Sequence, residues 1–385
     1  MTFLYTQKER EFKKELSDFV KKEIAPIAER IERENSIPKE IFERLGKKGY
    51  LGVLHEKAYG GTQRGVVYET MVAEEISSVS PALDMSRLAS VTLYGMPLRR
   101  FGNHEQKLNY LKPIALGEKL GAIGITEPKV GSDTAGMETR AEREGGEWIL
   151  NGEKRFITNG SNASYIVVFA ITNPKVHPKD GMTAFIIETQ WDGFHVVKDF
   201  ELLGMHGVRN THFRLENMHV PEENVLGGVG NGFAVLMDEL NSERVAIAGE
   251  ACGYALGAFR EAVKYSCERR QFDREIRKFE GVSFKIADMS TKIEAARLLT
   301  YQAAKMLDDG MDSTLHCSMA KYFATEIACE VCDEALQVLG GIGYTKEKIV
   351  ERLYRDARLM RIGGGTSEIM KFLIQREIYK SFGFD

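Results

Sequence analysis

The sequence predicts an α+β protein in which a small β domain separates two helical domains. Apolar residues recur every three or four positions over the first 120 residues and again from about residue 229, which is typical of helices packed on a core. Between these regions lie alternating or β-branched segments of strand length. The 385 residues also exceed what one hydrophobic core usually fills. We therefore expect an N-terminal α-helical domain at 1–120, a middle β domain at 121–228 and a C-terminal α-helical domain at 229–385.

A long first helix is predicted by one apolar stripe, which consists of Phe12, Leu16, Phe19, Val20, Ile24, Ile27 and Ile31. Further helices are expected at 38–49, 66–78, 83–101 and 104–116. The charged N-terminal stretch is neither a signal peptide nor an acid-poor transit peptide, so we expect a cytoplasmic location. No apolar run approaches the roughly 18 residues that span a bilayer, so no membrane association is expected.

The middle segment begins with a predicted β-hairpin. Residues 147–150 and 153–158 read as strands, and Asn151-Gly152 between them supplies the residues that a tight turn prefers. Further strands are expected at 165–172, 182–188 and 211–220, because these segments have strand length and are β-branched or alternating in pattern. The glycines at 227–232 partly match a dinucleotide-binding fingerprint, but the strand–helix–strand context and the acidic residue are missing. We interpret them as a turn at a domain boundary.

Composition and charge exclude several classes of function. A net charge of −4 argues against a nucleic-acid partner, because phosphate binding needs a basic surface. Cys329 and Cys332 are one helical turn apart, but no second pair accompanies them, and we interpret them as helix packing rather than a metal or redox site. His206, His212 and His219 alternate along a strand and turn, which favours surface positions, so we expect no metal site.

Four motifs could carry chemistry, and each has a plainer structural interpretation. Segment 124–133, GITEPKVGSD, offers hydroxyls and backbone donors for a phosphate or polar ring, or is a capped turn. Segment 156–160, FITNG, could stack on a planar cofactor, or Phe156 could be core. Segment 268–274, ERRQFDR, could be a solvated turn, and 337–344, QVLGGIGY, a helix C-cap.

The run Ile362-Gly363-Gly364-Gly365-Thr366 lies between two helical segments near the end of the chain. Three glycines leave the backbone N–H groups accessible but supply no side chain that could act as an acid, a base or a ligand. If this loop borders a reaction centre, the catalytic side chain must come from elsewhere in the chain.

Taken together, the motifs resemble the acyl-CoA dehydrogenase flavoprotein family over essentially the whole chain. The most specific matches are ITEPKVGSD and QVLGGIGY followed by RDARLMRIGGGT, although Val130 stands where the family usually has a small residue. The resemblance implies a C-terminal four-helix bundle, FAD as cofactor, an acyl-CoA substrate, an electron-transfer flavoprotein as electron acceptor and a homotetramer. It implies FAD contacts at Ile123, Ile125, Thr126, Gly131, Ser132, Phe156, Thr158, Thr366 and Glu368, and contacts with a neighbouring subunit's FAD at Arg269, Phe272, Gln337 and Gly341.

Dehydrogenation of an acyl thioester needs a carboxylate base for the α proton, a hydride acceptor and a donor to the thioester oxygen. Many members of the family carry the base as a glutamate where this chain has Gly364, whose N–H could still polarise the thioester. The chain resembles instead the subset that includes isovaleryl-CoA and long-chain acyl-CoA dehydrogenases, which places Glu243 in the role of the base. Leu236, Leu240 and Ile247 surround Glu243 at helical spacing, so burial is expected to raise its pKa.

The resemblance also concerns the substrate. Asn241 and Arg244 match positions that hold substrate or the pantetheine of CoA, and Ser132 is a further candidate for CoA. Asp84 lies near the position where glutaryl-type relatives carry an arginine, so a dicarboxylic substrate is not expected; Asp84 itself could line the pocket or be solvated. The alternative to a dehydrogenase is an enoyl-CoA reductase or an oxygen-reactive oxidase or monooxygenase on the same fold. A non-catalytic or nucleic-acid-binding relative would be expected to show a basic patch and to lack the base.

Overall fold

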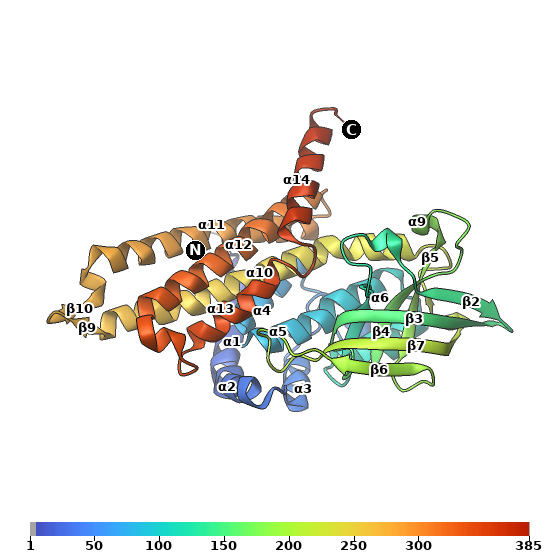
Figure 1. The fold of residues 1–385 in the computed structure, drawn as a ribbon, viewed down its shortest axis with the longest axis horizontal. Coiled ribbons are helices and arrows are strands. Elements are labelled where there is room, and N and C mark those ends of the chain that lie inside the picture. Colours follow the sequence, from blue (N-terminus) through green and yellow to red (C-terminus); the bar gives the residue numbers. More distant parts are fainter. Residues whose placement is uncertain (1–4, 385) are drawn as a thin grey trace.

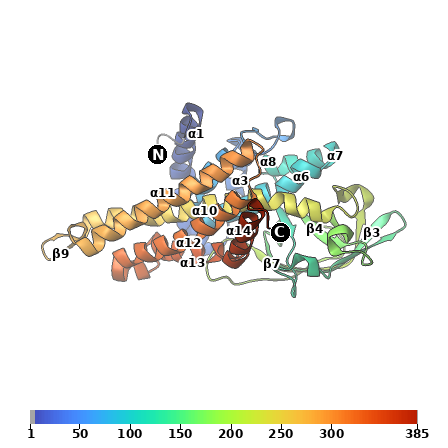
Figure 2. The same cartoon turned by 90° about the horizontal axis from the view of Figure 1, so that it is seen from above.

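The computed structural model describes residues 5–384, which form an elongated molecule with the β domain at one end. Long helices occupy the opposite end, and the first N-terminal helices lie below the middle of the molecule in the view of Figure 1. The same division appears when the molecule is turned by 90° (Figure 2). The expected order of helices, strands and helices is therefore confirmed. None of the described helices combines the length and apolar character needed to cross a membrane.

The N-terminal region is helical up to Ala115. Its helices are α1 (Gln7–Phe19), α2 (Ala25–Glu34), α3 (Lys39–Lys47), α4 (Val66–Ser77), α5 (Pro81–Leu88), α6 (Gly95–Phe101), α7 (His104–Gln106) and α8 (Lys112–Ala115). Three of the expected long helices contain a π-helical turn, at Val20–Ile24, Ala89–Tyr94 and Lys107–Leu111. Each of these turns is followed within three residues by a proline, at 26, 97 and 113. Proline lacks the N–H of a helical hydrogen bond and clashes with the preceding turn, so the wider turn accommodates it.

The β domain contains one eight-stranded, mostly antiparallel sheet. Its strands are β1 (Gly121–Gly124), β2 (Arg140–Glu144), β3 (Glu147–Thr158), β4 (Tyr165–Ile171), β5 (Met182–Glu188), β6 (Phe194–Asp199), β7 (Asn210–Pro221) and β8 (Val225–Leu226). The order is β6-β7-β3-β2-β4-β5-β8, and β1 pairs in parallel with β4. A short helix, α9 (Pro178–Gly181), joins β4 to β5.

The predicted hairpin at Asn151-Gly152 is wrong. Residues Glu147–Thr158 form one strand, and the hairpin turn lies earlier, at Gly145-Gly146 between β2 and β3. Asn151-Gly152 instead coincides with a register shift between β3 and β7, and the Asn151 side chain accepts a hydrogen bond from the Asn217 backbone N–H at 2.8 Å. The residues that favour a turn therefore form a β-bulge, which also tolerates the positive φ of Gly152.

Strand β4 fixes the β domain onto the helices because it is buried on both faces. Ile166 and Val168 point into a core enclosed by the sheet itself, whereas Val167 and Phe169 belong to the large helical core. All four side chains have no solvent exposure. Alternate residues of a strand face opposite sides, and both sides of β4 are buried. Its sequence is therefore a continuous apolar run.

The C-terminal region is built on α10 (Gly232–Glu268), which is 37 residues long. It packs with α11 (Glu280–Asp308), α12 (Thr314–Leu339) and α13 (Ile349–Met360), while α14 (Ser367–Ser381) projects away from the body (Figure 1). Two short strands, β9 (Arg270–Gln271) and β10 (Arg274–Glu275), close the tip between α10 and α11. The expected domain limits at 1–120, 121–228 and 229–385 stay predictions, although the transitions between helix and strand lie near them.

Candidate active site

Glu243 on α10 lies directly beside Gly364, in the loop between α13 and α14. Only 7% of Glu243 is exposed, and Ile247, one turn further along the helix, packs against the same loop. A Cβ at position 364 would overlap Cδ1 of Ile247 and lie 3.3 Å from Oε1 of Glu243. Gly364 also has a positive φ of 63°, which disfavours any side chain there. A glutamate at 364 and the present Ile247 and Glu243 therefore compete for the same space.

The backbone of the glycine loop is free to act as a donor at this point. In the described part of the chain, the N–H of Gly364 has no backbone acceptor, whereas the N–H groups of Ile362 and Gly363 donate to the carbonyl of Leu359. The Gly365 carbonyl accepts a hydrogen bond of 2.5 Å from Lys321 on α12. One carboxyl group and one available N–H therefore lie next to each other in a mostly buried site.

The charge on Glu243 is controlled by burial and by two cations. Burial raises the pKa of Glu243 above its ordinary value, while the nearby Arg244 and Lys321 charges lower it in part. The expected upward direction of its pKa is therefore confirmed. Arg244 is itself oriented by Asn241, whose side-chain oxygen accepts from Nη1 at 2.9 Å, and Asn241 donates to Thr314 at 3.1 Å. A carboxyl with a raised pKa is a stronger proton acceptor once ionised.

The loop after β1 is held by a buried ion pair that the sequence did not reveal. Glu127 and Lys154 are 3% and 0% exposed, and Lys154 Nζ lies 2.8 Å from Glu127 Oε1. Glu127 also accepts hydrogen bonds from the Glu138 backbone N–H and the Thr139 hydroxyl, at 2.5 Å each. Burial would raise the pKa of Glu127, but Lys154 and these hydrogen bonds outweigh it and lower the pKa.

Several predicted cofactor residues lie on or beside the loop that the Glu127–Lys154 ion pair holds in place. Ile123 is buried on β1, and Ile125 and Thr126 come directly after the strand; the Thr126 carbonyl accepts from the Arg155 backbone N–H at 2.8 Å. Gly131 and Ser132 are exposed, and nothing lies within 4 Å of the space where a Gly131 side chain would be. Val130 is buried and pairs with Glu127 through two backbone hydrogen bonds, so the larger residue is accommodated inside the loop.

Phe156 is an exposed aromatic residue rather than part of the core. It is 51% exposed and has a φ of 60° at a bulge in β3, a conformation that is unusual for an aromatic residue. Arg155 lies over its ring at 4.8 Å, and Phe200 packs beside it with a centroid distance of 4.8 Å. Thr158 ends the same strand. An open flat ring in a strained backbone is a surface on which a planar group can stack.

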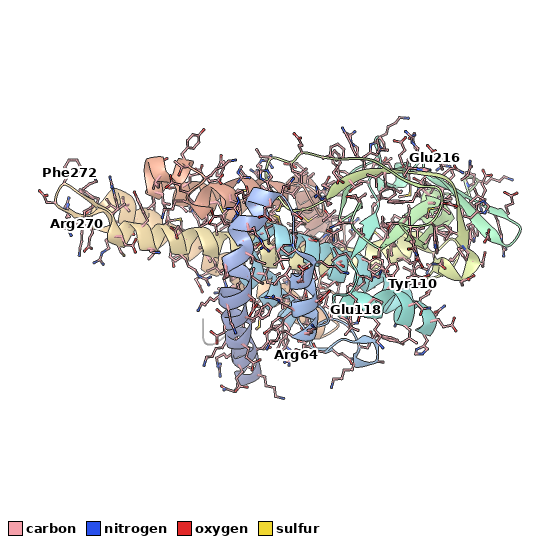
Figure 3. All side chains as sticks on the ribbon, turned by 90° about the horizontal axis from the view of Figure 1, so that it is seen from below. Arg64, Tyr110, Glu118, Glu216, Arg270 and Phe272 are labelled. Atoms are coloured by element: carbon pink, nitrogen blue, oxygen red, sulfur yellow. The ribbon has the colours of Figure 1, made fainter. Side chains whose placement is uncertain are left out.

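The other predicted cofactor residues separate into two groups. Thr366 caps α14, accepting a hydrogen bond from the Ile369 backbone N–H, and Glu368 lies in the first turn, so both flank the Gly364 loop. Arg269 and Phe272 lie at the tip beyond α10, where Phe272 is 84% exposed (Figure 3). The 26 residues from Glu243 to Arg269 correspond to about 39 Å of helix. Gln337 and Gly341, at the end of α12, are likewise exposed and about 24 Å or more beyond Lys321.

Asp84 is buried, which contradicts a solvated position. It forms an ion pair with Arg87 on the same helix, from Oδ1 to Nε at 2.5 Å, and Arg87 also binds Glu69 on α4 at 2.6 Å. Glu250, two turns after Glu243 on α10, belongs to the same cluster, in which burial and the Asp84 charge raise its pKa. Three carboxyl groups therefore surround one guanidinium in the core.

The histidines and the cysteine pair have structural neighbours. His206, His212 and His219 lie close to three different acidic residues, Glu32, Glu153 and Glu147, at 2.8–3.0 Å. Cys332 is buried and Cys329 partly buried, with sulfur contacts to the backbone carbonyls of Tyr254 on α10 and Ala357 on α13. These contacts agree with the interpretation of the pair as helix packing.

The comparison with known families agrees with the architecture. Residues 6–118 match the N-terminal domain of acyl-CoA dehydrogenases, residues 122–218 the middle domain, and residues 230–379 the C-terminal domain. The chain belongs to the acyl-CoA dehydrogenase family. It is therefore an oxidoreductase that acts on a CH–CH bond.

Individual relatives cover nearly the whole length of this dehydrogenase. An acyl-CoA dehydrogenase of Bacillus subtilis is 40% identical over 371 residues, which is 96% of this chain and 98% of the relative. A 3-(aryl)acrylate reductase of Clostridium sporogenes is 39% identical, covering 98% of this chain and 100% of the relative.

Solved structures extend the likeness to the fold. Butyryl-CoA dehydrogenase of Megasphaera elsdenii has a TM-score of 0.94 at 35% identity, with coverage of 97% of this chain and 98% of that one. A chain in the structure of the electron transferring flavoprotein of Acidaminococcus fermentans has a TM-score of 0.95 at 38% identity, with the same coverage.

The Glu127–Lys154 pair generates a prediction about stability. Lys154→Met should lower the free energy of unfolding by about 3–5 kcal/mol, because it leaves the Glu127 carboxylate buried without its cation. Glu127→Gln in addition should recover part of this loss. Urea unfolding of the single and double variants measures both effects, with exposed Lys129→Met as control. Equal losses in Lys154→Met and Lys129→Met would contradict the assigned role.

Proposed function

We propose that this enzyme dehydrogenates an acyl-CoA between Cα and Cβ to the 2-enoyl-CoA, with Glu243 as the base that removes the α proton. The contact between Glu243 and Gly364 carries the proposal: a buried carboxyl, whose pKa burial raises, lies beside a backbone N–H that has no backbone acceptor in the described chain. The first group can take a proton, and the second can donate to a thioester oxygen.

In the proposed mechanism, the thioester oxygen accepts a hydrogen bond from the Gly364 N–H, which stabilises negative charge as it develops on that oxygen. Glu243 takes the α proton on its carboxylate and becomes neutral, a form that its buried surroundings favour. When bound, FAD, the cofactor of this enzyme, would supply the acceptor for the hydride that leaves Cβ. Asn241 orients Arg244, and both are proposed to hold the CoA pantetheine, with Ser132 as a further contact.

The residues around the β domain fit a flavin cofactor. The open ring of Phe156, the empty space beside Gly131 and the exposed Ser132 suit a planar ring and a polar chain that approach the backbone closely. We assign Ile123, Ile125, Thr126 and Thr158 to the same site, together with Thr366 and Glu368 at the start of α14. The N-terminus of α14 can favour a negative or polar group there.

The remaining cofactor residues are proposed to act on a second copy of the chain. Arg269, Phe272, Gln337 and Gly341 are exposed and lie too far along the helices to reach the Phe156 region of their own chain. A homotetramer is proposed as the assembly. Light scattering of the FAD-loaded enzyme tests this, and a monomer that retains FAD would contradict it.

The acyl group is proposed to lack a second carboxylate. The proposal rests on Asp84, which stands near the position where glutaryl-type relatives carry an arginine and which is here buried and ion-paired with Arg87. In anaerobic flavin reduction, glutaryl-CoA should therefore react more slowly than butyryl-CoA. Faster reduction by glutaryl-CoA would rule out this restriction.

Two further points concern the direction of electron flow. Electrons are proposed to pass to an electron-transfer flavoprotein, a proposal supported by the likeness to a chain in such a flavoprotein structure. The likeness to an acrylate reductase supports a second candidate, in which the same residues run the reaction backwards on an enoyl substrate. Rates of oxidation of the reduced enzyme by enoyl-CoA and by electron-transfer flavoprotein distinguish the two directions.

Glu243→Gln should decrease anaerobic flavin reduction by acyl-CoA by at least about 1,000-fold, because the amide cannot accept the α proton. In the unsubstituted enzyme the rate should rise with pH through a pKa above the ordinary 4.5 of a glutamate, since Glu243 must be ionised to act. Stopped-flow absorbance of the flavin measures both. Glu330→Gln on α12, which removes a surface carboxylate paired with Lys292, is the control. Full reduction retained in Glu243→Gln would rule out the assigned base.

Moving the base to position 364 should fail unless space is made for it. In the Glu243→Gln background, Gly364→Glu should not restore flavin reduction, because the new side chain overlaps Ile247 and requires a positive φ. Adding Ile247→Ala should recover a measurable part of the rate. Ile247→Ala alone is the control, and full recovery by Gly364→Glu without it would contradict the steric argument.

A further inference from the structure

Lys321 is a buried cation at the back of the Glu243 site. Its side chain on α12 is fully buried, and its ammonium donates a hydrogen bond of 2.5 Å to the Gly365 carbonyl, the residue after Gly364. The partner is therefore the backbone of the glycine loop and not a carboxylate. Burial of a lysine without such direct neutralisation is unfavourable, which calls for a compensating role.

Four charged groups face Lys321 from the surrounding helices. Glu243 and Arg244 belong to α10, Glu326 to α12 and Glu368 to α14. Glu326 is already engaged, with Arg361 at 2.8 Å and the Ser367 hydroxyl at 2.5 Å. Burial lowers the pKa of Lys321 to about 8, and the Glu243 charge opposes this shift. At neutral pH the side chain is thus still mainly charged, and Glu243 is the acidic group with the largest effect on it.

We propose that Lys321 is a positioning residue for proton abstraction, acting on both halves of the site described above. Through the Gly365 carbonyl it anchors the Gly365–Thr366 peptide, and so restrains the loop in which the Gly364 N–H lies. Through its charge it favours the ionised form of Glu243, so that the base is ready at neutral pH. The inference rests on the proposed function, because it assumes that Glu243 is the base and Gly364 the donor.

Acetyl-CoA allows proton abstraction to be measured without hydride transfer. Its thioester has α hydrogens but no β carbon, so it cannot be converted to an enoyl product. When Glu243 removes an α proton in deuterated water and returns a deuteron, acetyl-CoA gains deuterium. No hydride is transferred in this exchange. Mass spectrometry of acetyl-CoA incubated with the FAD-loaded enzyme, as a function of pH, therefore reports the base and the oxyanion donor.

The uncharged variant Lys321→Met should shift the acidic limb of the exchange profile upward by about 1 pH unit, because removal of a cation raises the pKa of a carboxyl. Its maximum rate at high pH should fall as well, since the Gly365 carbonyl loses its donor. Lys321→Arg should keep the limb within about 0.3 unit of the unsubstituted enzyme, because the charge remains. Binding of acetyl-CoA, measured by calorimetry, should change less than about twofold, which separates positioning from substrate binding.

Lys292→Met is the matched control, because Lys292 pairs with Glu330 on the surface of the same helical bundle. Its exchange profile should equal that of the unsubstituted enzyme. If Lys321→Met does not fold, Lys321→Gln takes its place. An acidic limb that stays fixed in a folded uncharged variant, or that moves equally in Lys321→Arg, overturns the proposal. Exchange that persists in Glu243→Gln instead overturns the base, and with it the proposed function.

Discussion

The arrangement of the site depends on the backbone conformation at position 364. Its φ of 63° lies in the left-handed region, which disfavours a side chain, and a Cβ there would also overlap the tip of the Ile247 side chain. The loop can therefore contribute only N–H and C=O groups. In the proposed mechanism, α10 supplies the base and the loop supplies the polarising N–H, so the two tasks are divided between two elements that meet in one contact.

This division places strict demands on the surroundings. Burial of α10 raises the pKa of Glu243, and the charges of two nearby cations oppose that shift. Arg244 and Lys321 supply that balance from two helices, and Asn241 limits how Arg244 can move. The β domain contributes the second half, since β4 is buried on both faces and holds the sheet rigidly against the helices. The proposed cofactor surface at Phe156 is thus fixed relative to Glu243 by a shared core.

The sequence predicted the features that depend on local periodicity and on motifs. The three-part architecture followed from a change of period, whereas Glu243 was assigned from the family resemblance and supported by the apolar stripe around it. Features that depend on distant partners were not visible. Lys154 meets Glu127 from 27 positions away, and Lys321 meets the glycine loop from 44, with no sequence pattern linking them. Asn151-Gly152 has the composition of a turn, but pairing with β7 converted it to a bulge. Asp84 was ambiguous because its burial depends on Arg87 and Glu69.

The length of α10 has a consequence for how the sequence can change. Glu243 faces the glycine loop near one end of this helix, and Arg269 and Phe272 follow its other end. Inserting one residue between them would rotate the tip by about 100° relative to Glu243 and move it by only about 1.5 Å. Insertions of seven residues, which complete nearly two turns, preserve that phase better but move the tip by about 10.5 Å. The length of α10 and its angular phase are therefore constrained together.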